Sequence, residues 1–249
     1  MSHLTVDHEP GFVLSTRDWK ESSLFIDVFT QHFGRKRLIA RGVRRPTSAS
    51  RGLIVPFVPL SFSWFGQRSY LHQVKWVGGY PMPSGIAMLS AWYVNELLLK
   101  LLPLCDPYPT LFDRLQHTMQ ILATGKHLAS TLRKFEYHLL LELGLAPSLE
   151  KDAQDKAILA DQMYWVQHEQ NLIRLEKATK NSVDLQISGQ SLLNIHKEQY
   201  VDDRTKQEAR AFFQFLLTFY LPKNQINMSE MLHQLAPVSY THLRAHETK

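Results

Sequence analysis

The sequence predicts a soluble α+β protein of two domains, an N-terminal five-stranded β-barrel of the OB type followed by a mostly α-helical domain. Short runs rich in β-branched and aromatic residues, separated by Gly, Pro and Ser, fill the first eighty residues. Longer runs with helical periodicity follow. Between the two patterns, the segment Tyr80-Pro81-Met82-Pro83-Ser84-Gly85 breaks both strand and helix. We therefore expect domains over 1–80 and 81–237.

The first domain has five candidate strands, each a short apolar or alternating run that ends at turn-forming residues. They are Phe12–Ser15, Ser23–Thr30, Arg35–Arg41, Pro56–Trp64 and Tyr70–Val77. Five strands in about eighty residues suit an OB-type barrel. An SH3-like barrel or an open meander would give a similar pattern.

The second domain is expected to be built around an almost wholly apolar central helix, Ile86–Leu102. Pro and Gly residues separate it from the other helical runs. These runs are Thr110–Ala123, Leu128–Leu143, Thr205–Leu221 and the short terminal Ser229–Leu235. A small hairpin is possible near residues 163–176, where two short apolar runs flank a polar segment. The last residues, 238–249, follow a proline without apolar periodicity and read as a non-native tail, so His242 and His246 receive no function.

The positive charge is concentrated in the N-terminal domain. Residues 1–80 contain eleven Lys and Arg against five Asp and Glu. Seven of these cations lie between Gly34 and Gly52, where no acidic residue occurs: Arg35, Lys36, Arg37, Arg41, Arg44, Arg45 and Arg51. Such a cluster favours a polyanionic partner over a merely solvated surface. We therefore predict that these seven residues bind nucleic acid.

Strand alternation divides the cluster between two faces. In the third strand Arg35, Arg37 and Arg41 share one face with Ile39, while Lys36, Leu38 and Ala40 share the other. The other three arginines lie in the following segment, 42–52, whose small and turn-forming residues indicate a flexible loop. Reversing the charge of Arg35 and Arg37 is expected to weaken DNA binding without changing the fold.

Several aromatic side chains near this cluster are candidates for stacking on bases, although most strand aromatics pack into a core. The candidates are Trp19, Phe25, Phe33, Trp64, Phe65, Tyr70 and Trp76. The sequence does not sort core from surface among them.

No enzyme signature is present in the sequence. It lacks a Walker phosphate loop, a dinucleotide fingerprint, a Gly-x-Ser-x-Gly elbow and a metal-binding histidine pair within the native-looking segment. The single cysteine, Cys105, is expected to be a small buried side chain and excludes both disulfides and cysteine zinc sites. We expect no cofactor, no metal, no catalysis, and a cytoplasmic location without membrane spans. A metal-dependent nucleic-acid hydrolase and an OB-fold RNA-binding or ribosome-associated protein remain the alternatives.

From Gly11 to Pro237 the sequence resembles the bacterial RecO family of recombination mediators. The resemblance is carried by the order and spacing of short motifs. They are Phe12-Val13-Leu14, Arg17, Glu21-Ser22-Ser23-Leu24, Asp27-Val28-Phe29-Thr30, Gly34-Arg35, Arg41-Gly42, Pro56-Phe57, Pro59-Leu60, Tyr93 to Leu98, Arg133-Lys134-Phe135-Glu136, Leu143-Gly144 and Ser229 to Leu232. The missing cysteines place it with the zinc-free members.

The resemblance implies a non-enzymatic DNA repair protein that binds single- and double-stranded DNA through its OB domain and anneals complementary strands. It implies that RecR, and in some systems RecF, help it load RecA onto strands coated by single-stranded-DNA-binding protein (SSB) at the nucleoid. It also implies a site for the acidic C-terminal tail of SSB in the helical domain. Arg133 and Lys134 match or adjoin the basic position of that site.

Overall fold

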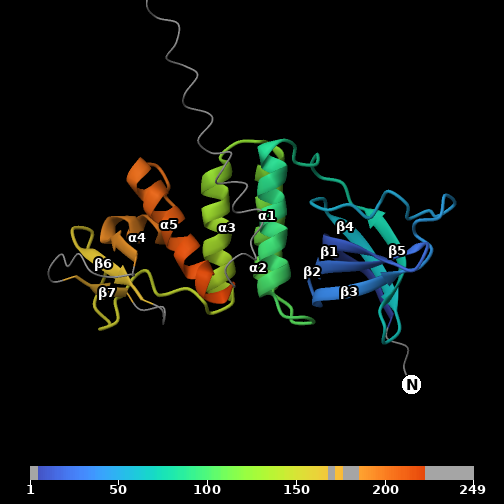
Figure 1. Cartoon of the computed structure of the whole chain (residues 1–249), viewed down its shortest axis with the longest axis horizontal. Coiled ribbons are helices and arrows are strands. Elements are labelled where there is room, and N and C mark those ends of the chain that lie inside the picture. The colour runs from blue at the N-terminus through green and yellow to red at the C-terminus, as the bar shows by residue number, and fades with distance from the viewer. Residues whose placement is uncertain (1–4, 168–171, 176–184, 222–249) are drawn as a thin grey trace, which may run out of the picture. The chain divides into compact units, whose positions relative to one another are not determined.

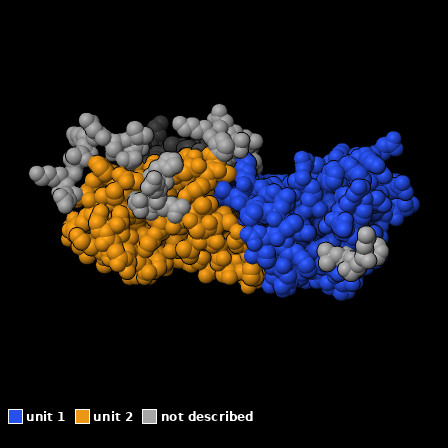
Figure 2. Space-filling model, turned by 90° about the horizontal axis from the view of Figure 1, so that it is seen from below, with its two compact units in different colours: residues 1–107, 122–126, 223–249 blue, residues 108–121, 127–222 orange. Residues whose placement is uncertain are grey.

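The computed structural model describes residues 5–167, 172–175 and 185–221 (Figure 1). Backbone contacts divide the described residues into two compact units, coloured separately in Figure 2. Unit 1 contains residues 5–107 and 122–126, and unit 2 contains those from 108 to 121 and from 127 onward. The expected terminal helix Ser229–Leu235 and the tail 238–249 lie outside the described residues.

Unit 1 contains five strands, which pair in the closed order β1-β2-β3-β5-β4. They are β1 (Thr5–Trp19), β2 (Ser23–Thr30), β3 (Gly34–Ala40), β4 (Leu60–Phe65) and β5 (Tyr70–Trp76). Strand β1 is antiparallel to both β2 and β4, and β3 closes the sheet by a parallel pairing with β5 at Ile39 and Tyr70. This confirms the predicted five-stranded sheet of OB type.

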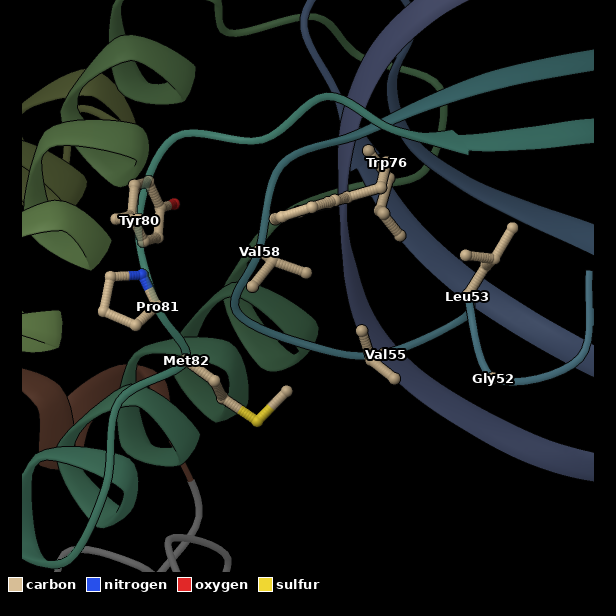
Figure 3. Close-up of a pocket in the computed structure, with 9 residues that line it drawn as sticks. Gly52, Leu53, Val55, Val58, Trp76, Tyr80, Pro81 and Met82 are labelled. Carbon is tan, nitrogen blue, oxygen red and sulfur yellow. The ribbon is translucent and has the colours of Figure 1, made fainter.

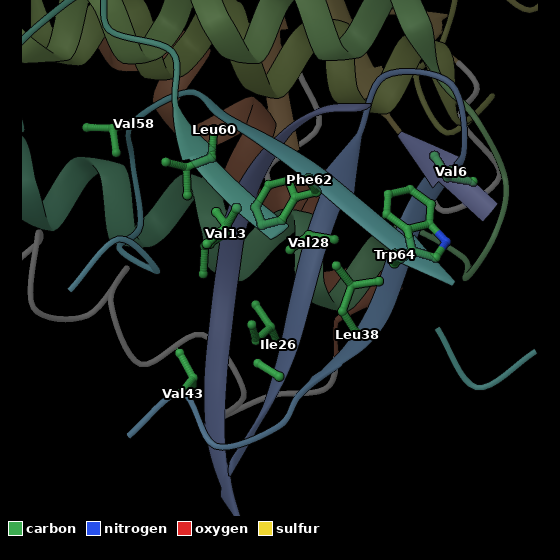
Figure 4. Packing of buried hydrophobic residues seen from close by; sticks show 12 residues of the cluster. Val6, Val13, Ile26, Val28, Leu38, Val43, Val58, Leu60, Phe62 and Trp64 are labelled. Carbon is green, nitrogen blue, oxygen red and sulfur yellow. The ribbon is translucent and has the colours of Figure 1, made fainter. Parts of the chain in front are cut away.

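The interior of the closed sheet is filled by alternate residues of all five strands (Figure 4). Ile26 and Val28 of β2 and Leu38 of β3 are completely buried there, as is Trp64 of β4. Because side chains alternate along a strand, Arg35, Arg37 and Ile39 lie on the outer face of β3. The division of this strand into two faces is as the sequence predicts.

Helix α1 (Ile86–Leu101) packs on part of the outer face of the same sheet, and both belong to unit 1. The side-chain amide of Asn95, which is 1% exposed, donates to the carbonyl oxygens of Val13 (3.1 Å) and Leu14 (3.2 Å). The ring of Trp92 meets Phe57 edge-on, with centroids 4.9 Å apart. Trp92 and Asn95 therefore attach α1 to the sheet within unit 1.

Unit 2 combines four helices with a small sheet in the order β7-β6-β8. The elements are α2 (Pro109–Ala123), α3 (Leu128–Glu142), β6 (Met163–Val166), β7 (Leu172–Arg174), β8 (Leu185–Ser188), α4 (Gly189–His196) and α5 (Asp203–Tyr220). Strands β6 and β7 form an antiparallel pair where the hairpin was expected, whereas β8 and α4 are additional. Ser188 and Asp202 cap α4 and α5 by accepting hydrogen bonds from Ser191 and Thr205.

Gly34, at the start of β3, is placed where only glycine fits. Its φ angle is 65°, and a Cβ atom there would lie 1.9 Å from the carbonyl oxygen of Asp106. Gly52 has a similar φ of 79° but open space around it, so it serves as the matched control. We expect Gly52→Ala to cost about 1–2 kcal/mol of folding free energy for the left-handed backbone. Gly34→Ala should lower the free energy of unfolding in urea by measurably more than Gly52→Ala does. Equal losses would show that the segment 102–107 moves away from the added Cβ atom at no cost.

Candidate nucleic-acid interface

The structure separates the seven predicted cations into two groups. Arg37, Arg41, Arg44, Arg45 and Arg51 are exposed, on the outer face of β3 and in the loop that follows it. Arg35 and Lys36 are only half-exposed and contact the end of α1 and the segment after it. The first group is therefore exposed to a ligand, and the second is bound to the end of α1 and the segment after it.

Arg37 is held in place by a buried carboxylate. Its guanidinium nitrogens lie 3.1 and 3.2 Å from Oδ1 of Asp27, which is 3% exposed and pairs with Arg37 across β2 and β3. Arg17 of β1 approaches the other oxygen of Asp27 at 4.0 Å. Two arginines beside one carboxylate leave a net positive charge, and the carboxylate holds both guanidinium groups in place. Arg17 was absent from the predicted site, and only the strand register shows that it joins Arg37.

The loop 42–52 is folded into successive turns and is attached to the β1–β2 connection. The backbone amide of Arg44 donates to the carbonyl of Ser22 (3.0 Å), and that of Gly42 donates to the Ser23 hydroxyl (3.1 Å). The Arg44 guanidinium lies 2.9 Å from a carboxylate oxygen of Asp18, at 45% and 72% side-chain exposure. These contacts attach the loop to the β1–β2 connection and place Arg45 and Arg51 on a segment of successive turns.

Arginines also surround Tyr70 at the start of β5. The guanidinium carbon of Arg41 lies 3.9 Å from the centre of the Tyr70 ring. A hydrogen bond from Arg68, in the turn before β5, is the main cause that lowers the pKa of the Tyr70 hydroxyl, and Arg41 contributes to the same effect. Arg68, like Arg17, was not predicted, because it is isolated in sequence and joins the cluster only through the fold.

The side chain of Arg35 is bound to another part of unit 1 and is not free to contact a ligand. Its guanidinium donates to the carbonyl of Leu99 near the end of α1, and its own carbonyl accepts from the amide of Cys105 at 2.8 Å. Burial lowers the pKa of Arg35, with the charges of Asp27 and Arg37 acting in opposite directions. Lys36 points its ammonium at the sulfur of Cys105 (3.4 Å), and Cys105 is exposed, so the expectation that it is buried is wrong.

Apart from Arg17, the outer cluster lies in a stretch of chain without acidic residues. No Asp or Glu occurs from Val28 to Asn95, whereas nine Lys and Arg do. The nearby carboxylates, Asp18 and Asp27, both come from before this stretch and are each engaged by arginine. Positive potential therefore extends over β3, the loop and the β4–β5 turn, which favours a polyanion.

An apolar pocket of about 280 Å³ forms a different kind of surface in the same unit (Figure 3). It is lined by Leu53 and Val55 after the basic loop, by Trp76 at the end of β5, and by the linker residues Tyr80 and Met82. Trp76 is 63% exposed. Burial raises the pKa of the Tyr80 hydroxyl. The pocket has no lining cation, so phosphate binding is not its chemistry.

On α3 the two residues predicted to bind the SSB tail have unlike surroundings. Arg133 is 14% exposed and lies 2.5 Å from Oε1 of Glu136, which is 1% exposed. Lys134 is 42% exposed and lies 3.4 Å from Glu198. Glu198 also accepts from His138 at 2.7 Å and lies 3.8 Å from Arg114. Its burial favours a raised pKa, but His138 and Lys134 outweigh burial and lower it.

Within the described ranges, no group of three or more His, Cys, Asp and Glu side chains is arranged to hold a metal ion. No helix among those residues has the length and apolar character needed to cross a membrane. Neither observation extends to the remaining residues.

Two family sequence models match the chain, "Recombination protein O N terminal" over residues 1–80 and "Recombination protein O C terminal" over residues 82–227. A "DNA repair protein RecO" of Neisseria meningitidis serogroup C is 36% identical over 240 residues, covering 94% of this chain and 91% of its own. Proteins of the same name from Dechloromonas aromatica and Nitrosospira multiformis are 36% and 35% identical, with coverage of 92% and 91% of this chain and 96% and 94% of theirs.

Proposed function

The chain belongs to the RecO family of DNA repair proteins, and from this premise we propose that it is a recombination mediator without catalytic activity. In this proposal it binds single- and double-stranded DNA, anneals complementary strands, and with RecR helps to load RecA onto SSB-coated single strands. RecF joins in some systems. The protein acts at the nucleoid and uses no cofactor, nucleotide or metal.

The observation that carries the proposal is the row of exposed cations on the outer face of unit 1 and its adjoining loop. The residues that we propose as DNA contacts are Arg17, Arg37, Arg41, Arg44, Arg45, Arg51 and Arg68. Neutralising phosphates on two strands at once reduces the repulsion that opposes pairing, which is the physical requirement of an annealing protein. Arg35 and Lys36 support this surface by joining β3 to the end of α1 and to Cys105 after it.

For the SSB tail, we propose that α3 provides the site and that Lys134 is its direct contact. The side chains of Arg114, Lys134 and His138 converge on Glu198, so carboxylates of an acidic peptide would compete with this one side chain. Arg133 would contribute only indirectly, because its guanidinium is bound to Glu136.

The experiment follows annealing of two complementary oligonucleotides, each coated with SSB, with the full chain and no nucleotide. We expect faster annealing than with SSB alone, and a steep loss of DNA affinity with salt. If about five cations neutralise phosphates, the logarithm of the single-strand association constant should fall with a slope of about −3.5 against the logarithm of salt concentration. Salt-sensitive DNA binding without faster annealing would reject the mediator role, and binding to neither strand form would reject DNA binding as well.

A further inference from the structure

Part of the outer face of the sheet carries a continuous row of mostly aromatic side chains. Binding of phosphates by the neighbouring cations does not require such a row. The strand pairings align Phe25 with Ile39, Ile39 with Tyr70, and Tyr70 with Phe65. The row therefore crosses β2, β3, β5 and β4, and Arg17 of β1 pairs with Phe25 at one end. We call Phe25, Ile39, Tyr70 and Phe65 the aromatic row. Four steps between neighbouring strands, from Arg17 to Phe65, span roughly 19 Å.

The aromatic row is separate from the interior of the sheet. Leu24, Ile26, Leu38 and Leu71 fill or flank the interior cluster, and each is a chain neighbour of a row member. Phe65 is 44% exposed, and the other three row members are half-buried. An apolar row on a sheet face is ordinarily covered by another layer of structure. Here it is bordered by the exposed side chains of Arg37 and Arg41.

The rings of the row are arranged for contact with planar groups. Phe65 and Tyr70 have centroids 6.0 Å apart, and Trp19 extends the row beside Phe25 at 5.2 Å. Cations lie over two of these rings, with Arg41 above Tyr70 at 3.9 Å and the Lys20 ammonium 4.7 Å from the Trp19 ring. A guanidinium held above a ring is itself a planar surface on which a base can stack.

We propose that the aromatic row stacks on the unpaired bases of a single DNA strand while Arg17, Arg37 and Arg41 hold its phosphates. This inference rests on the proposed DNA-binding function and adds that the site distinguishes single strands from duplexes. In a duplex the bases are stacked on each other and their faces are closed, so a duplex engages only the cations. The face therefore favours single strands over duplexes, without preference for base sequence, and releases the product of annealing more readily than it releases its substrates.

The test compares three ligands of equal length: an oligothymidine, an abasic oligonucleotide with the same phosphates, and a duplex. We expect the wild-type chain to bind the oligothymidine about tenfold or more tightly than the abasic strand. Phe65→Leu combined with Phe25→Leu should remove most of this advantage and leave binding to the abasic strand and the duplex unchanged.

Trp76→Leu is the matched control, because Trp76 is an exposed aromatic on β5 that lies outside the row and lines the apolar pocket. It should leave all three affinities unchanged. The thermal unfolding midpoint of each variant shows whether it is folded, and Phe65→Leu alone, at an exposed position, gives the same comparison if the double variant is unstable. Equal wild-type affinity for oligothymidine and abasic strand overturns the stacking role and leaves DNA binding standing. Failure to bind any of the three ligands overturns both.

Discussion

Reversing the charge of Arg45 and Arg51 is expected to lower the affinity for single-stranded DNA by about 25-fold at 0.1 M salt, before added repulsion is counted. Each lost phosphate contact removes about 0.7 from the salt slope, so each contributes about fivefold at that concentration relative to 1 M salt. Both residues are exposed on the loop 42–52, and neither forms an ion pair with any residue that the structure describes. The double variant Arg45→Glu, Arg51→Glu should therefore fold normally.

The measurement is the affinity at several salt concentrations, and the salt slope should become shallower by about 1.4. Lys151→Glu with Lys156→Glu is the control, because these two exposed lysines belong to unit 2 and give the same change of net charge. The control should change affinity little. A similar loss in both double variants would mean that net charge, rather than the loop, governs binding.

These residues replace the pair that the sequence alone suggested. Arg35 binds the Leu99 carbonyl of α1, and Arg37 neutralises Asp27, which is 3% exposed. A glutamate at either position would disturb these contacts, so lost DNA binding would be confounded with a damaged fold.

Replacing Arg133 by alanine is expected to destabilise unit 2 by about 3–5 kcal/mol, because it breaks a buried ion pair with Glu136. Lys134→Ala, beside it on the same helix, removes only a half-exposed pair with Glu198 and should cost about 0–1 kcal/mol. Urea unfolding of the two variants measures the difference. The double replacement Arg133→Met with Glu136→Leu should recover most of the stability, since it removes both charges and keeps apolar volume.

This contrast also decides how the SSB-tail site is tested. Arg133→Ala would weaken peptide binding by unfolding α3 as readily as by removing a contact, so its loss is not specific. Lys134→Ala should weaken binding of the tail peptide and leave DNA affinity unchanged. Equal stability of the Arg133 and Lys134 variants would contradict the buried ion pair and return Arg133 to the list of direct contacts.

Local patterns were sufficient to predict most of the elements. Strand β2 has the predicted limits, and α1, α2 and α3 lie within one residue of theirs. The N-terminal extension of β1 was not predicted, because residues 5–11 have no apolar alternation and are held by pairing with β4. Strand β8 and helix α4 have only four and eight residues and follow each other directly, so neither is long enough for its pattern to be recognised in a sequence window.

Only those features of the site that depend on residues close together in the sequence were predictable. The cluster of cations between Gly34 and Gly52 is visible in the sequence, and so is the alternation that points Leu38 inward. The contribution of Arg17 and Arg68, the withdrawal of Arg35 toward α1, and the alignment of Phe25 with Tyr70 through Ile39 depend on pairings between distant residues. Register sorts the seven candidate aromatics, leaving Trp64 inside and Phe65 outside.

The hydrogen bonds from Asn95 of α1 to Val13 and Leu14 of β1 have a consequence for the design of protein fragments. A fragment that stops at residue 80, where the first family match ends, would lack α1 and with it the amide that binds Val13 and Leu14. Phe12, Leu14 and Phe29, which are at most 1% exposed, would lose the cover of that side of the sheet and favour aggregation. An isolated DNA-binding fragment should therefore be cut after residue 107, so that insolubility of a shorter piece is not mistaken for a failure of the barrel to fold.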